Sequence, residues 1–407
     1  MTLNKKLIAY PFLCICLVAI FSMTAFASSD QTAYDKLSDN QGGLMSIAYR
    51  GDTSEYPANS LEAIESAIDF GADMVSVSVQ MTSDGVLFLC EDDTLNHIFD
   101  TDLLDASTLT FDQIEDLKLL DATAAASKYD LATLEDAIKE VGDGILIIDN
   151  SWEFKDEIYA LISQMDKFEN VMLRTYEEAD VINEWTSSLE EDVMVIGVYD
   201  SFVVFTMMSH LNDLTDAGQF AVQYESANYF SMMYTNLFTK NYSLDDNARA
   251  IAVAYDLEKS GQRPDSTRGW DEIISQGYSI IETDNIEQLC LYIEQTEQVA
   301  DDINELMLTN FDIDTSLYSD ASVSNFEYAI KTANALGTNA CLDELQDARS
   351  MLISGINDLV FSTKTDTQTG ALNVTVSKVI AVLIMGGIIV GVQIYVHKRQ
   401  DKKTKKN

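Results

Sequence analysis

Arginine and carboxylate side chains at the ends of apolar segments are the residues best suited to do chemistry in this chain. Arg50 follows the apolar run that ends at Tyr49, Glu91 follows a second run, and Asp149 ends a third. A guanidinium offers a fork of N–H donors that suits a phosphate or a carboxylate, so Arg50 is a candidate anion-binding group. Arg50 can equally pair with Glu91 or Asp149 and fill its own pocket as a structural ion pair. Tyr49 is expected as a packed aromatic ring with a hydrated hydroxyl.

Composition excludes several other kinds of site. The 407 residues include three histidines and five cysteines, with no C-x-x-C pair, so a zinc site built from Cys and His is short of ligands. The run Glu91-Asp92-Asp93 lacks the spaced ligands and the glycine of a calcium loop. A formal net charge of −42 excludes a nucleic-acid binder that relies on basic contacts to phosphates. We therefore expect no nucleic-acid partner.

The elements that must position these residues alternate between short apolar runs and stretches with helical periodicity. This alternation over about 250 residues predicts an α/β fold, a (β/α)₈ TIM barrel over residues 40–298. A doubly wound open sheet remains an alternative on pattern alone. Nine strand candidates compete for eight places, and Phe220–Tyr224 is expected to be the extra one. The candidates are Leu44–Tyr49, Met74–Val79, Val86–Cys90, Ile145–Asp149, Val171–Thr175, Val193–Tyr199, Phe220–Tyr224, Ile251–Tyr255 and Ser279–Thr283.

The pattern changes after the barrel. Two amphipathic helices predict a small helical module over residues 305–361. The module is similar to small three-helix "found in various architectures" modules, which implies a cell-surface setting. Polar residues 362–373 are expected to form a linker.

Both ends of the chain indicate export and anchoring. Residues 1–27 have a basic start, an apolar stretch and an A-x-A site, which predict a secretory signal peptide; an uncleaved anchor is the alternative. Residues 374–396 predict one C-terminal transmembrane helix, and the lysine-rich residues 397–407 predict a cytoplasmic tail. We expect a single-pass plasma-membrane protein on a bacterial cell surface, with its N-terminal domain outside.

Four sequence motifs carry a resemblance to a known family. The chain resembles the glycerophosphodiester phosphodiesterase family, a group of phosphatidylinositol-phospholipase-C-like TIM barrels. The resemblance implies a barrel in which two histidines act as acid and base around a divalent cation held by carboxylates. The motifs are I-A-Y-R-G at 47–51, Y-P-A-N-S-L at 56–61, G-A-D-M-V-S-V-S-V-Q-M-T-S-D-G at 71–85 with V-L-F-L-C-E-D-D-T-L at 86–95, and G-Y-S-I-I-E-T-D at 277–284.

The chain departs from the family at most reactive positions. The two histidine positions are Tyr49 and Glu91, and the lysine of the family's E-I-K motif is absent after Asp149. The metal-ligand positions implied by the resemblance are Ala58, Ser76, Ser78 and Asp149. We therefore predict no catalytic residues and no metal site, with Ca²⁺ or Mg²⁺ needed only if the site is active. The predicted ligand-binding candidates are Arg50, Asn59, Glu91 and Asp149.

These residues leave three functional hypotheses. The favoured one is a catalytically degenerate, membrane-anchored barrel that binds a glycerophosphodiester, another anionic glycerol phosphate, or a surface partner. The second is an active phosphoric diester hydrolase of lipid metabolism with a rewired site, which would use Arg50, Glu91 and Asp149 with Tyr49 or His97. The third is a structural surface stalk.

Overall fold

Residues 31–92, 94–102, 105–121, 123–200, 221–225, 249–255, 265–310 and 312–362 are described by the computed structural model of the chain. The expected signal peptide, transmembrane helix and cytoplasmic tail lie outside these residues, as does nearly all of the expected linker. Among the helices that are described, none combines the length and the apolar character needed to cross a membrane.

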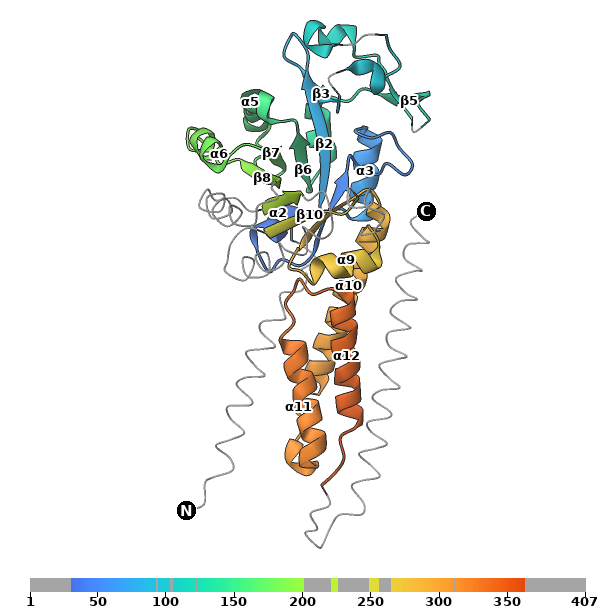
Figure 1. Cartoon of the computed structure of the whole chain (residues 1–407), viewed down its shortest axis with the longest axis vertical. Helices are drawn as coiled ribbons and strands as arrows, with labels where there is room; N and C mark the ends of the chain where they lie inside the picture. Colours follow the sequence, from blue (N-terminus) through green and yellow to red (C-terminus); the bar gives the residue numbers. More distant parts are fainter. Residues whose placement is uncertain are drawn as a thin grey trace. The chain divides into compact units, whose positions relative to one another are not determined.

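Eight parallel strands close into a barrel. They run in the order β1 (Met45–Tyr49), β11 (Ile280–Thr283), β10 (Arg249–Val253), β9 (Ala221–Glu225), β8 (Met194–Asp200), β7 (Val171–Thr175), β6 (Ile145–Asp149) and β2 (Met74–Met81). The pairing of β2 with β1 closes the ring, with Tyr49 beside Ser76. Closure excludes the doubly wound open sheet and establishes the barrel (Figure 1).

The expectation about the extra strand was wrong. The segment expected to be surplus forms β9, which pairs in parallel with β8 and β10 inside the ring. The surplus candidate is instead β3 (Leu87–Leu89), which pairs antiparallel with β2. The sequence signal of β9 is weak because its Gln223 is polar, although this residue lies buried in the barrel. The sequence signal of β3 is strong because both of its faces are apolar. One face packs against the barrel, and the other packs against Phe99.

The loop after β3 carries an insertion that the sequence did not predict. A two-stranded antiparallel ribbon, β4 (Lys118–Leu120) with β5 (Ala126–Asp130), lies there with three short 3₁₀ turns. Its own apolar cluster includes Leu95, Phe99, Ile114 and Leu119. The insertion therefore has a small core beside the barrel.

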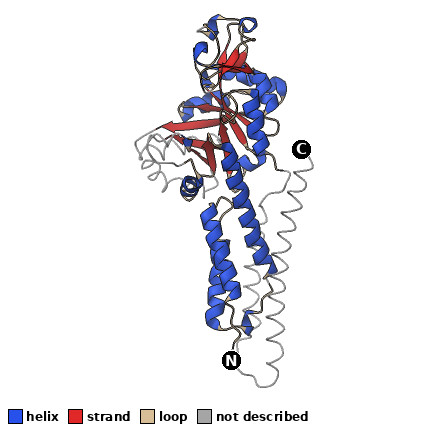
Figure 2. Cartoon of the chain, turned by 90° about the vertical axis from the view of Figure 1, so that its right-hand side faces the viewer, coloured by secondary structure: helices blue, strands red, loops and turns tan. Residues whose placement is uncertain are grey.

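Helices follow most strands of the barrel and cover its outer face, seen as blue around red in Figure 2. They are α3 (Leu61–Phe70), α4 (Leu134–Glu140), α5 (Lys155–Met165), α6 (Ala179–Thr186), α9 (Thr267–Ile274) and α10 (Ile286–Thr309). Alternate strand residues such as Val75, Leu146 and Ile281 pack outward against these helices. Because both faces of the sheet are buried, most strand residues are apolar, and several of the inward positions toward the carboxyl ends are polar.

Helix α10 runs across the boundary expected between barrel and helical module. It continues for 24 residues and packs against α12 (Leu342–Asn357), with α11 (Asp320–Asn334) beside them in both views (Figures 1 and 2). The module therefore comprises three helices, one more than the sequence pattern indicated. Asp271 joins the module to the barrel, because its carboxylate accepts hydrogen bonds from the Tyr292 hydroxyl at 2.8 Å and the Asp343 amide at 3.2 Å.

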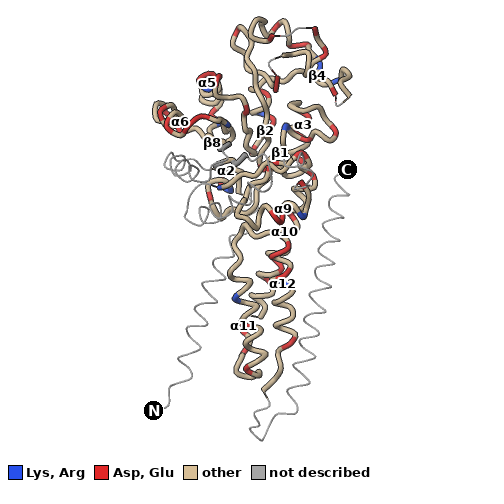
Figure 3. Tube along the Cα trace, viewed as in Figure 1, with Lys and Arg blue, Asp and Glu red and all other residues tan. Residues whose placement is uncertain are grey.

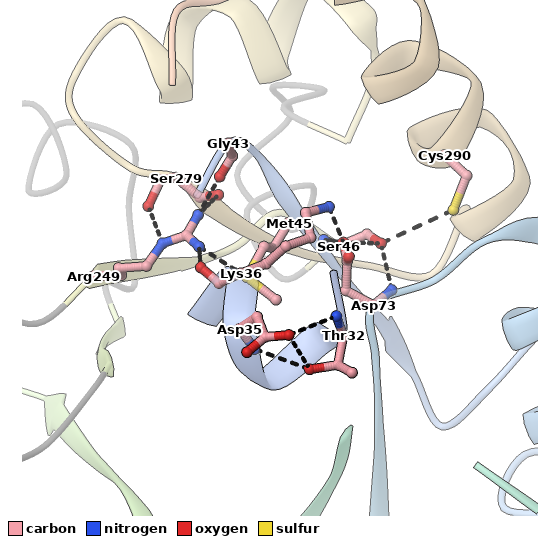
Figure 4. Close-up of polar contacts among 10 residues, drawn as sticks. All are labelled: Thr32, Asp35, Lys36, Gly43, Met45, Ser46, Asp73, Arg249, Ser279 and Cys290. Carbon is pink, nitrogen blue, oxygen red and sulfur yellow. Dashed lines mark hydrogen bonds and ion pairs between the residues drawn. The ribbon is translucent and has the colours of Figure 1, made fainter. Parts of the chain in front are cut away.

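The amino ends of the strands are closed by the short helix α2 (Ala33–Ser38). Leu37 packs into the barrel interior with Met45 and Ile47. Arg249 is buried beside it and donates to the carbonyl oxygens of Lys36 and Gly43 and to Ser279 (Figure 4). Burial lowers the pKa of Arg249 to about 10. Described residues fill this end of the barrel, which leaves the carboxyl ends of the strands as the place where a ligand would enter the interior.

Candidate functional site

The interior of the barrel changes from apolar to polar along the strand direction. Near the amino ends the inward side chains are apolar, including Ile47, Met74, Ile147 and Met172. Inward positions repeat every two residues along a strand, so the next ones lie toward the carboxyl ends. On six strands these next inward residues are Tyr49, Ser76, Ser78, Asp149, Arg174, Gln223 and Glu282, whereas β8 and β10 contribute the apolar Val198 and Val253. We call this polar end the barrel mouth. It is where barrels of this architecture place their active sites.

Arg174 is the central charge of the barrel mouth. Its guanidinium lies 3.3 Å from Oδ1 of Asp149 and 3.1 Å from Oε1 of Glu282. Ser76 donates its hydroxyl to the same Glu282 oxygen at 2.7 Å. Residues from four strands, β2, β6, β7 and β11, thus form one cluster around a buried cation.

Burial and charge act in opposite directions on this cluster. Burial alone would lower the pKa of Arg174, but Asp149 and Glu282 together outweigh it and raise that pKa. Burial, reinforced by the negative charge of Glu282, raises the pKa of the Tyr255 hydroxyl. Burial is also the largest cause of the raised pKa of Tyr49. Both tyrosines therefore stay neutral at pH 7, and neither is activated as a base.

Arg50 forms a second ion pair at the rim of the mouth. Its guanidinium contacts the carboxylate of Glu91 and the hydroxyl of Tyr49, and it lies 4.2 Å from the centre of the Tyr49 ring. Tyr49 in turn stacks on Tyr255, with ring centroids 4.0 Å apart. Of the two partners that the sequence left open for Arg50, the structure therefore has Glu91.

Three residues at the mouth adopt left-handed backbone conformations. Arg50, Asn59 and Asn150 have φ values of 59°, 60° and 56°. This conformation costs roughly 1–2 kcal/mol for Arg50 and less for the two asparagines, whose short polar side chains tolerate it. Hydrogen bonds maintain it: the Asn59 amide donates to the Arg50 carbonyl at 3.1 Å, and the Asn59 side chain accepts from the Ser78 amide at 3.2 Å. Strained backbone of this kind concentrates at binding and catalytic sites.

A hollow of about 170 Å³ opens beside the mouth, between the first strand–helix loop and the insertion. Asn59, Glu91 and His97 line it, together with Ala58. His97 is held through Nδ1, which lies 2.9 Å from Oδ2 of Asp92. Two of the four predicted ligand-binding residues thus share one hollow with a histidine.

The other two predicted ligand-binding residues, Arg50 and Asp149, belong to different ion pairs. Asp149 is paired with Arg174 rather than with Arg50. Sequence reasoning missed Arg174, Glu282 and Tyr255. The available signal was a charged residue inside each of two otherwise buried strands, V-M-L-R-T and I-I-E-T. Buried charge in a strand requires a partner, so these two residues could have been predicted to meet.

The residues at the implied metal positions do not fit a divalent cation. Such an ion requires about six oxygen ligands that include carboxylates. Ala58 offers no ligand, Ser76 is hydrogen-bonded to Glu282, and Asp149 is paired with Arg174. Within the described part of the chain, no group of three or more His, Cys, Asp or Glu residues is placed to hold a metal.

A closed parallel barrel with a polar, strained mouth at the carboxyl ends of its strands defines a TIM-barrel protein with a candidate small-molecule site. Residues 50–229 match the model of the glycerophosphoryl diester phosphodiesterase family. Within the TIM-barrel class, the chain therefore resembles the glycerophosphodiester phosphodiesterases, as its motifs indicated.

Individual proteins are similar to this chain in sequence or in fold. A glycerophosphodiester phosphodiesterase from Caldanaerobacter subterraneus subsp. tengcongensis is 40% identical over 50 residues, 12% of this chain and 21% of that protein. The chain thus matches about a fifth of the length of that relative. A glycerophosphoryl diester phosphodiesterase from Parabacteroides distasonis has a TM-score of 0.53 at 20% identity, over 65% of this chain and 92% of the other.

A third relative was solved with a bound product. It is a phosphodiesterase from Oleispira antarctica in complex with sn-glycerol-3-phosphate, with a TM-score of 0.47 and 14% identity, over 64% of this chain and 99% of the other.

Proposed function

We propose that this chain is a glycerophosphodiester phosphodiesterase-like protein that has lost hydrolysis and binds a ligand or a partner at the barrel mouth. The observation that carries the proposal is that the charged residues at the mouth are already paired with one another. Arg50 is engaged by Glu91, and Arg174 is engaged by Asp149 and Glu282. General acid–base catalysis needs a group that titrates near the working pH. At the two histidine positions, Tyr49 has a pKa that burial raises further from neutrality, and the Glu91 carboxylate is already paired with Arg50.

The ligand class that we propose is an anionic glycerol phosphate. Arg50 is the cation that such a ligand could reach, because its side chain is 21% exposed while that of Arg174 is 7% exposed. A phosphate would have to compete with Glu91 for the guanidinium. Binding to the wild-type protein is therefore expected to be weak, and Glu91 is expected to control it.

Calorimetry with sn-glycerol-3-phosphate tests this ligand class. Glu91→Gln frees the guanidinium and removes one negative charge, so it should tighten binding at least about fivefold, or about 1 kcal/mol. Arg50→Ala should abolish binding. Glu305→Gln, which removes one exposed carboxylate on α10, is the matched control and should leave affinity unchanged. Equal affinities for wild type, Glu91→Gln and Arg50→Ala would rule out Arg50 as the phosphate-binding group.

We also propose that residues 374–396 anchor the chain in a bacterial plasma membrane, with the barrel outside and residues 397–407 in the cytoplasm. The apolar span followed by lysines supports this topology. Protease treatment of intact cells should remove the barrel and leave a small membrane-bound fragment. Full protection of the barrel in intact cells would contradict the orientation.

A second candidate function is an active hydrolase with a rewired site. The observation that favours it is the His97–Asp92 pair in the hollow that Glu91 also lines. An imidazole fixed by a carboxylate is a competent general base. In this case Ca²⁺ or Mg²⁺ would have to bind through residues outside the implied metal positions. Hydrolysis of glycerophosphocholine that His97→Ala abolishes and Glu305→Gln retains would establish this alternative.

A further inference from the structure

The barrel mouth encloses two carboxylates that require a cation. The Glu282 side chain is fully buried and that of Asp149 is 20% exposed. A carboxylate taken out of water is stable as an anion only when a positive charge or several hydrogen bonds replace its hydration. Arg174 supplies that charge to both groups, at 3.3 Å and 3.1 Å.

This cluster coincides with positions that the sequence resemblance assigns to a metal. Ser76 and Asp149 stand at two implied metal-ligand positions, and both take part in the cluster, Ser76 through its 2.7 Å hydrogen bond to Glu282. The resemblance implies a carboxylate at position 76, where this chain has a serine, and Glu282 reaches the Ser76 hydroxyl from β11 on the other side of β1. The negative charge is thus retained at this place in the barrel, but it comes from another strand.

We propose that the Arg174 guanidinium is a resident cation that takes the place of a divalent metal ion at the barrel mouth. The wild-type mouth then needs no metal to hold Asp149 and Glu282. Removing the guanidinium should convert these two carboxylates and the Ser76 hydroxyl into a divalent-cation site. This inference concerns the charge balance of the fold and does not depend on which ligand the protein binds.

The oxygen set that Arg174 would leave behind suits Ca²⁺ or Mg²⁺. It comprises two carboxylates and one hydroxyl, and waters could enter the space that the guanidinium vacates. Oε2 of Glu282 is buried and has no hydrogen-bond partner among the described residues, so this oxygen is free to coordinate. The hydrogen bonds that Arg174 and Ser76 donate to Glu282 all fall on Oε1.

The test compares the thermal stability of four full-length proteins with and without Ca²⁺. They are the wild type, Arg174→Gln, Arg174→Lys, and the double variant Arg174→Gln/Asp149→Asn. A background of about 150 mM KCl screens the acidic surface, whose many Asp and Glu residues are spread over the described chain (Figure 3). Tryptophan fluorescence reports unfolding, and Ca²⁺ is added to about 10 mM.

Arg174→Gln should lower Tm by roughly 5 °C or more, because it leaves two buried carboxylates without a cation. Ca²⁺ should recover at least about half of that loss in Arg174→Gln. The wild type and Arg174→Lys should show only the small common shift due to the acidic surface. The double variant should show no larger shift than the wild type, because one carboxylate ligand has gone.

Two results would overturn the proposal. One is an Arg174→Gln protein that Ca²⁺ fails to stabilise beyond the wild-type shift, whatever its own stability. The other is stoichiometric Ca²⁺ uptake by the wild type, measured by calorimetry, that Asp149→Asn abolishes. The second result would mean that metal and guanidinium share the mouth rather than replace each other.

Discussion

Replacing Gly51 by alanine should destabilise the protein more than the same change at a matched glycine. Gly51 follows Arg50 and has a φ of +85°. A Cβ at this position would lie 2.6–2.7 Å from the backbone and Cβ of Ala63 on α3. The loop approaches the helix this closely because the Asp52 amide donates to the Ala63 carbonyl at 2.8 Å. Gly85 has the same φ of +85°, but a Cβ there would meet nothing within 4 Å.

The two glycines therefore separate backbone strain from steric overlap. Gly85→Ala should cost about 1 kcal/mol, the strain of an L-residue in the left-handed region. Gly51→Ala should cost the same strain plus about 1–3 kcal/mol for forcing the loop and α3 apart, a total of roughly 2–4 kcal/mol. Because Arg50 is the preceding residue, that displacement should also loosen its ion pair with Glu91.

Urea unfolding followed by tryptophan fluorescence measures this difference. The three tryptophans include the fully buried Trp270, which reports the integrity of the barrel. Both variants should keep the wild-type slope of free energy against urea, so that a shift in midpoint is a change in stability. Equal losses for Gly51→Ala and Gly85→Ala, within about 0.5 kcal/mol, would refute the reasoning, because the close approach to α3 would then carry no cost.

Three further predictions follow from burial and hydrogen bonding. Burial raises the pKa of Asp265 from 3.8 to about 7, so the folded state binds this proton more tightly than the unfolded state. The protonated carboxyl contributes at most roughly 4 kcal/mol to the free energy of unfolding near pH 4, and this contribution is lost as the pH rises through 7. Asp265→Asn should therefore flatten the plot of unfolding free energy against pH between pH 4 and 7. A plot with the wild-type slope in this range would contradict the prediction. Asp271→Ala should lower the free energy of unfolding in urea by roughly 2–3 kcal/mol, because it leaves the Tyr292 hydroxyl and an α12 amide without their shared acceptor. A loss below about 0.5 kcal/mol would show that these two hydrogen bonds do not stabilise the protein. Burial raises the thiol pKa values of Cys290 and Cys341 to about 12, so a disulfide reagent at about pH 8 should react with them only after unfolding, and rapid labelling of the native protein would show that they are accessible.

The barrel was predictable because its signal is local. Each strand is a short apolar run, and each run alternates with a helical segment, so the order of elements follows from the chain itself. The one misassigned strand shows the limit of that signal. β9 carries Gln223 into the barrel interior, and β3 is apolar because it packs under the insertion rather than in the ring. The spacing of apolar residues predicts that a segment is buried, but it does not predict which element of the fold buries that segment.

The candidate site was predictable only in part, for a similar reason. The motifs placed Tyr49, Arg50 and Glu91 among the site candidates with both Glu91 and Asp149 open as partners of Arg50, and the structure has Arg50 against Glu91 and Tyr49. Arg174 and Glu282 are 108 residues apart, and their contact depends on the closure of the ring. Their charges inside apolar strands were visible in the sequence and predict that the two residues pair, but only the fold shows that Asp149 contacts the same guanidinium.

Hydrolysis of glycerophosphocholine and glycerophosphoglycerol by the purified full-length chain tests the central claim most directly. Each substrate is assayed with Ca²⁺ or Mg²⁺, with and without a chelator, and with Arg50→Ala as the control variant. The account predicts no turnover of either substrate by folded protein under any of these conditions. Chelator-sensitive turnover that Arg50→Ala abolishes would contradict it and would identify the chain as a metal-dependent phosphodiesterase.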